Sequence, residues 1–288
     1  MLFRSINQSY CEVSAIEAGI ADLPLEWVTN TARPGERIIA PALSFAIRRV
    51  GKDELILFDL GIRKDWENIS PTFGERMREL TFGISVPQDV IEGLAQGGAR
   101  PEAVTHIVLS HLHFDHVGDP RAFPHAEFVL GGASRALLAA NPDGMVPQGL
   151  LPAARTRFLD DPARWPPLGP FAHALDLFGD GAMYVVDAPG HVPGHINLLA
   201  RTSPDGAWVL LAGDSAHDRR LLTGEAGIAR HGPFGCAHVD CAEAEAHLAR
   251  IRELMEMPRV RVLLAHDTPW WKENQGKAGF WPDVIQSL

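Results

Sequence analysis

Cysteine is scarce in this chain of 288 residues, which contains only Cys11, Cys236 and Cys241. An odd number of cysteines without CxxC spacing favours neither a disulfide framework nor a site in which thiolates bind zinc. We therefore expect all three to be buried or free thiols.

Long apolar runs and basic clusters are missing as well. The chain has no 18 consecutive apolar residues, and its first 21 positions carry polar and acidic side chains where a secretory signal needs an apolar stretch. The formal net charge is -10, and no run of Lys and Arg forms a local basic stripe that would attract phosphates. These absences predict a cytoplasmic protein that binds neither membranes nor nucleic acid.

What the chain does contain is typical of a globular protein. Hydrophobic residues make up 46% of the sequence and charged residues 22%, which is too apolar for a disordered chain and sufficient for a packed core. The length suits one α/β domain, and no repeat of about 20 to 50 residues indicates a solenoid or propeller. We therefore expect one domain over residues 1–288.

Apolar runs alternate with turns in two successive sets, each associated with helices. The first set of expected strands is 44–50, 54–59, 105–110 and 127–130, and the second is 182–186, 196–201, 208–212 and 260–265. Helices are expected from Ser85 to about Gly98, over 134–140, and from Asp240, where Glu243 completes a capping-box pattern. This order predicts two sheets packed face to face with helices outside.

Four potential metal ligands crowd six positions directly after the apolar run 107–109. They are His111, His113, Asp115 and His116. Imidazole and carboxylate groups are ligands that divalent ions prefer, and a loop that leaves a strand can turn alternate side chains toward one point. The cluster therefore predicts a metal site.

Further ligands are expected at three other strand ends. His191 lies in the Gly- and Pro-rich segment 189–195, Asp214 closes an apolar run, and His266 follows another. Because a carboxylate has two oxygens, Asp214 can bridge two cations and offset their mutual repulsion.

The order of these motifs, HxHxDH at 111–116, GHxPGH at 190–195, GD at 213–214 and a strand-terminal His266, resembles the metallo-β-lactamase superfamily. The resemblance spans Asp59 to His266 and implies an αββα four-layer sandwich with a site for two divalent metal ions, expected to be zinc, at one edge of the sheets. It assigns His111, His113 and His191 to the first ion, Asp115, His116 and His266 to the second, and Asp214 to both. It also implies that Asp59 orients a ligand histidine and that His195 makes a structural hydrogen bond.

Within the superfamily, the chain is most similar to the lactonase-type hydrolases. That similarity implies cleavage of a small-molecule lactone or other carboxylic ester by a metal-bridging hydroxide, with Asp115 as the acid-base residue. The lactonases carry a Tyr three residues after the shared Asp, and His217 stands there in this chain, where it can donate to an oxyanion or simply lie at the rim. The absence of a GxSxG elbow agrees with metal-dependent hydrolysis.

Several alternatives stay open at this level. The same site suits a thioesterase or phosphodiesterase, a persulfide-dioxygenase-like oxidoreductase would use a single iron, and a metal-binding scaffold without activity is the least favoured. Manganese, iron and cobalt suit the ligands as well as zinc. Phe82, Trp270, Trp271 and the irregular segment 141–170 either line an acyl pocket or belong to the core, with core favoured. A homodimer is a possible assembly.

Overall fold

The computed structural model describes residues 8–70, 73–140, 149–230 and 235–288, and it contains two sheets packed face to face. In spatial order the seven-stranded sheet is β4 (Gly83–Ser85), β1 (Cys11–Pro24), β2 (Arg37–Arg49), β3 (Leu55–Phe58), β5 (Val104–Val108), β6 (Glu127–Leu130) and β7 (Thr156–Phe158). The five-stranded sheet is β12 (Val260–Leu263), β11 (Trp208–Leu211), β10 (Ile196–Arg201), β9 (Met183–Asp187) and β8 (Ala174–Asp176).

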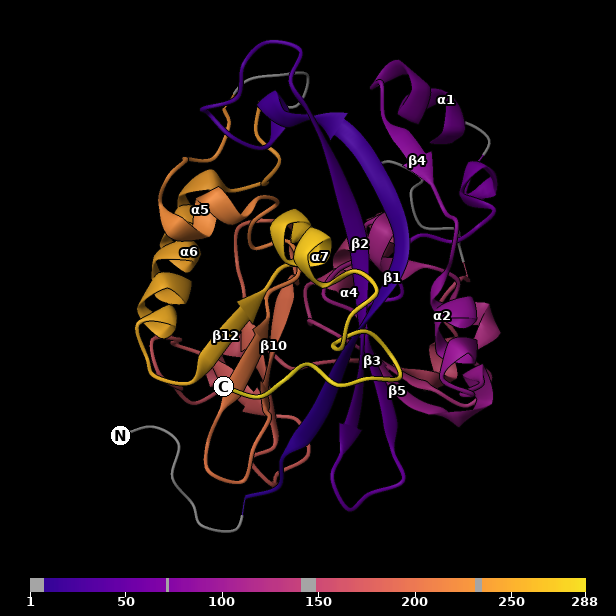
Figure 1. The fold of residues 1–288 in the computed structure, drawn as a ribbon, viewed down its shortest axis with the longest axis vertical. Helices are drawn as coiled ribbons and strands as arrows, with labels where there is room; N and C mark the ends of the chain where they lie inside the picture. Colours follow the sequence, from indigo (N-terminus) through magenta and orange to yellow (C-terminus); the bar gives the residue numbers. More distant parts are fainter. Residues whose placement is uncertain (1–7, 71–72, 141–148, 231–234) are drawn as a thin grey trace.

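Helices cover the outer faces of both sheets (Figure 1). The helices of the described residues are α1 (Phe73–Glu79), α2 (Val90–Gln96), α3 (Phe114–Val117), α4 (Ser134–Ala140), α5 (Arg219–Thr223), α6 (Cys241–Met255) and α7 (Thr268–Asn274). Helices α5 and α6 lie on the side of the five-stranded sheet, and α2 and α4 on the side of the seven-stranded sheet. The predicted αββα arrangement is confirmed.

Three apolar layers explain this architecture. Phe45 and Phe58 of the first sheet pack against Leu198 and Leu211 of the second in the central core. The outer faces are closed by further buried side chains, including Leu94 of α2 on one side and Ile251 of α6 on the other. Because the parallel strands β3, β5 and β6 are covered on both faces, their sequences are continuous apolar runs rather than alternating ones.

The predicted strands all exist, and most of their ends fall within two residues of the observed ones. The predicted helix at 134–140 is confirmed, and α6 begins after Asp240, whose side chain accepts hydrogen bonds from the N–H groups of Ala242 and Glu243. The helix start at Ser85 was wrong. Ser85 ends β4, and α2 begins only after Asp89, because Asp89 forms a capping box with Glu92.

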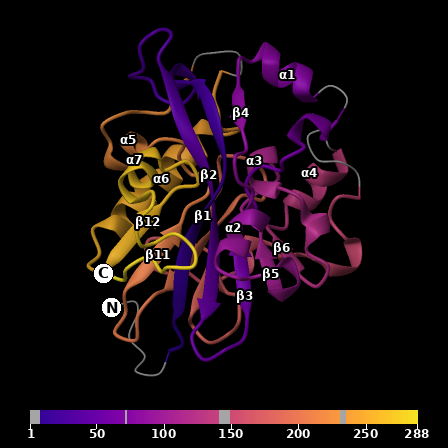
Figure 2. The same cartoon turned by 45° about the vertical axis from the view of Figure 1, so that its right-hand side comes forward.

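A long two-stranded ribbon, β1 paired with β2, was only partly predicted. The register shifts between Glu17 and Ile20, where Gly19 adopts a φ of +110° that favours glycine. Figure 2 shows the ribbon rising toward the end of the molecule at which α1 and β4 lie. This end of the ribbon forms part of the cavity described below.

The expectation of three free thiols was wrong for two of them. Cys11 is a buried free thiol, whereas Cys236 and Cys241 are joined by a disulfide. The segment before α6 turns back onto the start of that helix, which brings together two cysteines whose spacing alone gives no such signal. Among the helices within the described ranges, none is both long and apolar enough to cross a membrane.

Candidate metal centre

All seven predicted ligand positions meet at one edge of the two sheets. His111 and His113 follow β5, His191 lies between β9 and β10, Asp214 follows β11, and His266 follows β12. Two compact groups result, and within each the potential ligand atoms lie within 4.8 Å of one another. The first contains His111, His113, His191 and Asp214, and the second contains Asp115, His116 and His266.

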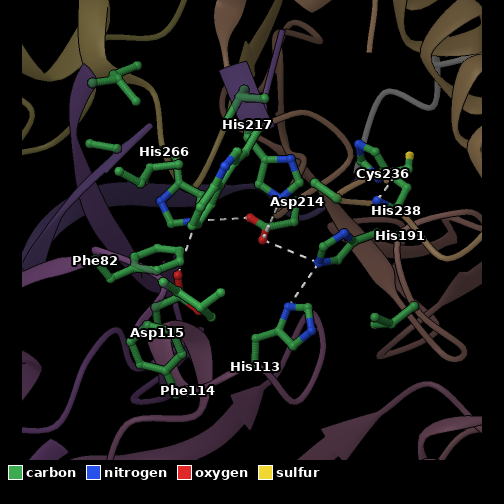
Figure 3. A pocket seen from close by; sticks show the side chains of 18 of the residues that line it. Phe82, His113, Phe114, Asp115, His191, Asp214, His217, Cys236, His238 and His266 are labelled. Atoms are coloured by element: carbon green, nitrogen blue, oxygen red, sulfur yellow. Dashed lines mark hydrogen bonds and ion pairs between the residues drawn. The ribbon is translucent and has the colours of Figure 1, made fainter. Parts of the chain in front are cut away.

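Three imidazole nitrogens of the first group lie in mutual contact, and Figure 3 shows His113 and His191 pointing toward one another. The Nε2 atom of His111 lies 2.8 Å from Nδ1 of His113, and Nε2 of His191 lies 3.2 Å and 3.1 Å from these two atoms. A hydrogen bond needs a protonated nitrogen on one side and a lone pair on the other. Three nitrogens in mutual contact cannot supply that combination for all three pairs. Burial lowers the pKa of His111 and His191 well below the ordinary value, so both rings are neutral and keep a lone pair for a metal.

The shared carboxylate connects the two groups. Oδ2 of Asp214 lies 3.4 Å from Nε2 of His191, whereas Oδ1 lies 3.2 Å from Nε2 of His116 and 3.3 Å from Nε2 of His266. Within the described residues, His116 Nε2 and Asp214 Oδ1 are buried and have no hydrogen-bond partner despite this proximity. The lone pairs of these two atoms face a shared space and no hydrogen-bond donor, which fits a bound cation. Imidazole and carboxylate ligands suit a divalent cation.

Hydrogen bonds behind the ligands fix their orientation. The carboxylate of Asp59 accepts hydrogen bonds from the backbone N–H and the hydroxyl of Ser110 at 2.6 and 2.7 Å, and lies 2.8 Å from Nδ1 of His116. Nδ1 of His266 lies 2.7 Å from the carbonyl oxygen of Pro41. Since these oxygens accept, both Nδ1 atoms carry the proton, and each Nε2 is left to face the site.

His195 makes structural hydrogen bonds, as expected, and belongs to neither ligand group. Its Nδ1 donates to the carbonyl oxygen of Ala188 at 3.0 Å, and its Nε2 accepts from the backbone N–H of Asp214 at 3.1 Å. Burial lowers its pKa to about 4, in agreement with this neutral tautomer.

Two further histidines lie beside the cluster. Nε2 of His217 is 3.2 Å from Oδ2 of Asp214, and its side chain lines the cavity. The ring of His238 lies 5.2 Å from that of His191 and 5.0 Å from that of His217, and burial lowers its pKa well below the ordinary value. His238 was not predicted, because a lone histidine in a loop matches no motif.

A cavity of about 450 Å³ opens over both ligand groups. Its apolar wall contains Leu23, Trp27, Ile38, Met77, Phe82 and Phe114. Phe82 lines this cavity and also packs, partly buried, against a cluster of buried apolar side chains, whereas Trp270 and Trp271 pack in the central core. Residues 141–148 lie outside the described residues, and none of residues 149–170 lines this cavity.

Comparisons with known proteins identify the family of this chain. Residues 40–266 match the family described as the metallo-beta-lactamase superfamily. The chain is 36% identical over 173 residues to gamma-lactamase FDB1 of Fusarium pseudograminearum, covering 58% of this chain and 42% of that protein. It is 30% identical over 311 aligned positions to cytochrome P450 monooxygenase mpaDE' of Penicillium brevicompactum, covering 97% of this chain but 35% of that protein. The chain thus spans less than half the length of these two relatives.

A solved structure shares the whole fold. An N-acyl homoserine lactone hydrolase, with N-hexanoyl-L-homoserine bound at its catalytic metal centre, has a TM-score of 0.74 and 20% identity to this chain. The alignment covers 95% of this chain and 98% of that one. The family match, the fold and the His/Asp cluster show that the chain belongs to the metallo-β-lactamase superfamily and resembles its lactonase-like branch.

Proposed function

We propose that this protein is a metal-dependent hydrolase that opens lactones or other carboxylic esters at a site for two divalent ions, expected to be zinc. The observation that carries the proposal is the position of Asp214. Its two oxygens face two separate ligand groups, and the side chain lies at the floor of a cavity large enough for a small organic substrate.

The two ligand groups fit one ion each, and they differ in the kind of side chain that they offer. His111, His113 and His191 would hold the first, Asp115, His116 and His266 the second, and Asp214 both. Ions bound there supply Lewis-acid chemistry, which polarises a carbonyl group and lowers the pKa of a coordinated water.

Two residues of the chain take further roles. Asp115 lines the cavity with its side chain 14% exposed, so it can reach substrate, hold a proton and deliver it to the leaving oxygen. His217 also lines the cavity beside the shared carboxylate, and we assign it a hydrogen bond to the carbonyl oxygen as negative charge develops there. The apolar wall excludes water from the reacting groups.

A γ-lactam is the second candidate substrate, because the 36% identical relative is described as a gamma-lactamase. A cyclic amide is cleaved by the same attack on a carbonyl, and Asp115 would then protonate a nitrogen instead of an oxygen. Phosphodiesters are less favoured, since Arg76 is the only Lys or Arg among the described residues that line the cavity.

The test combines metal analysis with a substrate panel of γ-lactones, aryl esters, γ-lactams, thioesters and phosphodiesters. We expect about two metal ions per chain and lactone opening that is lost with a chelator and restored by zinc. Activity in protein freed of metal would overturn the proposal. One iron per chain, with oxygen uptake on a persulfide, would instead indicate the dioxygenase alternative.

A further inference from the structure

His238 lies outside both ligand groups, yet it is placed like a binding residue. It lines the cavity in the segment 236–239 and is 4% exposed. Its Nδ1 atom is buried and has no hydrogen-bond partner among the residues that the structure describes. Most buried polar atoms in native proteins have a partner, so an unpaired one in a side chain that lines a cavity marks that side chain as a candidate for contact with a bound molecule.

The backbone on the C-terminal side of His238 is hydrogen-bonded to the loop that carries His191. The N–H of Val239 donates to the carbonyl oxygen of His191 at 2.9 Å, and that of Asp240 donates to the carbonyl oxygen of Gly190 at 2.9 Å. The disulfide between Cys236 and Cys241 closes the segment around it. A side chain on such a constrained segment is held in one place, as specific recognition requires.

The cavity is chemically two-sided around the candidate metal centre. Figure 3 shows His238 beside His191 and Cys236, on the side away from Phe82 and Phe114. A molecule whose reacting carbonyl lies over Asp214 therefore meets aromatic side chains in one direction and an imidazole in the other. An imidazole can donate or accept one hydrogen bond, which an apolar substituent cannot satisfy.

We propose that His238 is a specificity-determining residue that hydrogen-bonds a polar substituent of the substrate. Preferred substrates are then lactones with an apolar body on one side of the scissile bond and a hydroxyl, carbonyl or amide group on the other. The inference rests on the proposed lactone hydrolysis. A site that presents a hydrogen-bonding group selects against an analogue that lacks the partner, because the group is then buried unpaired.

The experiment uses phenyl-substituted γ-butyrolactones that carry a hydroxyl or, as size-matched controls, a methyl group at each ring position. kcat/KM is measured for the wild type, His238→Phe, His238→Gln and the surface control His125→Gln, each with its metal content. We expect the wild type to prefer at least one hydroxyl compound over its methyl counterpart by about tenfold. His238→Phe should remove this preference by lowering kcat/KM on the hydroxyl compound toward that on the methyl compound, whereas His238→Gln keeps part of the preference.

Each of the remaining outcomes would contradict either the inference about His238 or the proposed function. Equal losses on both substrates, or a lower metal content in both His238 variants, would mean that the residue supports His191 and does not select substrates. An active wild type with no preference in any hydroxyl and methyl pair would overturn the inference alone. A wild type that opens no lactone would overturn the proposed function, and the inference with it.

Discussion

The backbone N–H of Asp214 donates a hydrogen bond to Nε2 of His195 at 3.1 Å. Because the other nitrogen of His195 donates to the carbonyl oxygen of Ala188, this ring exists in one neutral tautomer that links the 188–195 loop to the turn after β11. The contact is close. Gly213 has a φ of +49°, and a Cβ atom there would lie 2.8 Å from His195 Nε2. His195 therefore sets the position of the carboxylate that faces both ligand groups.

Replacing His195 by Ala should weaken metal binding without removing a ligand. Groups that orient ligands typically contribute about 10- to 100-fold in metal affinity or activity, and we expect a loss in this range. Equilibrium dialysis against zinc and kcat/KM on a γ-lactone would measure it. His125→Ala, at an exposed histidine, is the matched control. Unchanged zinc affinity in His195→Ala would show that Asp214 keeps its position without this hydrogen bond.

Asp59 orients His116 in the second ligand group, and Asp59→Asn tests that role separately. The substitution preserves shape but removes the charge that faces Nδ1 of His116, and its amide cannot accept all the bonds that the carboxylate accepts. We expect about 10- to 100-fold weaker binding of the ion held by His116. The metal content after dialysis should then fall from two ions toward one. A variant that loses both ions together would contradict the assignment of Asp59 to one group.

Most of the candidate ligand positions were predictable because they are encoded locally, whereas His191 lies in the loop between β9 and β10. A buried apolar run followed at once by His or Asp places that group at a strand end, and parallel strands bring such ends to one edge. His238 was not predictable, since its segment is held at the site by tertiary contacts such as the hydrogen bond between Val239 and His191. The ribbon strand β1 was missed for a related reason. Polar residues such as Glu12 and Glu17 interrupt its apolar pattern, and its inner face is defined only by pairing with β2.

Gly190 is expected to tolerate no side chain, because the loop that carries Gly190 and His191 packs closely against the first turn of α6. Its φ is +122°, and an added Cβ would lie 2.3 Å from the backbone nitrogen of Ala244. Gly190→Ala should therefore lower the free energy of unfolding by about 3 kcal/mol and weaken metal binding through the displaced His191. Gly224→Ala is the control, since its φ is +78° but nothing lies within 4 Å of the added Cβ, and it should cost about 1 kcal/mol. Equal decreases in the free energy of unfolding of the two variants, measured by urea unfolding, would contradict the steric explanation.

His247 of α6 makes the fold sensitive to acid independently of the metal ligands. Its Nε2 donates to Oδ1 of Asn197 at 2.8 Å, while Nδ1 is buried without a partner in the described part of the chain. Burial lowers the pKa of His247 from 6.5 to about 3. Between these values the unfolded chain binds a proton that the folded chain does not, so stability falls as the pH decreases through this window.

His247→Gln keeps an N–H donor for Asn197 but removes the titration. At pH 7 the variant should be less stable than the wild type, because the amide fills the imidazole site imperfectly. Below about pH 6 the wild type should lose stability faster than the variant, by up to about 1.4 kcal/mol for each pH unit, so the gap between them narrows. Urea unfolding of both proteins at pH steps from 7 to 4 isolates this difference, because every other titrating group is common to the two. Parallel stability curves would mean that His247 takes up its proton without unfolding the chain.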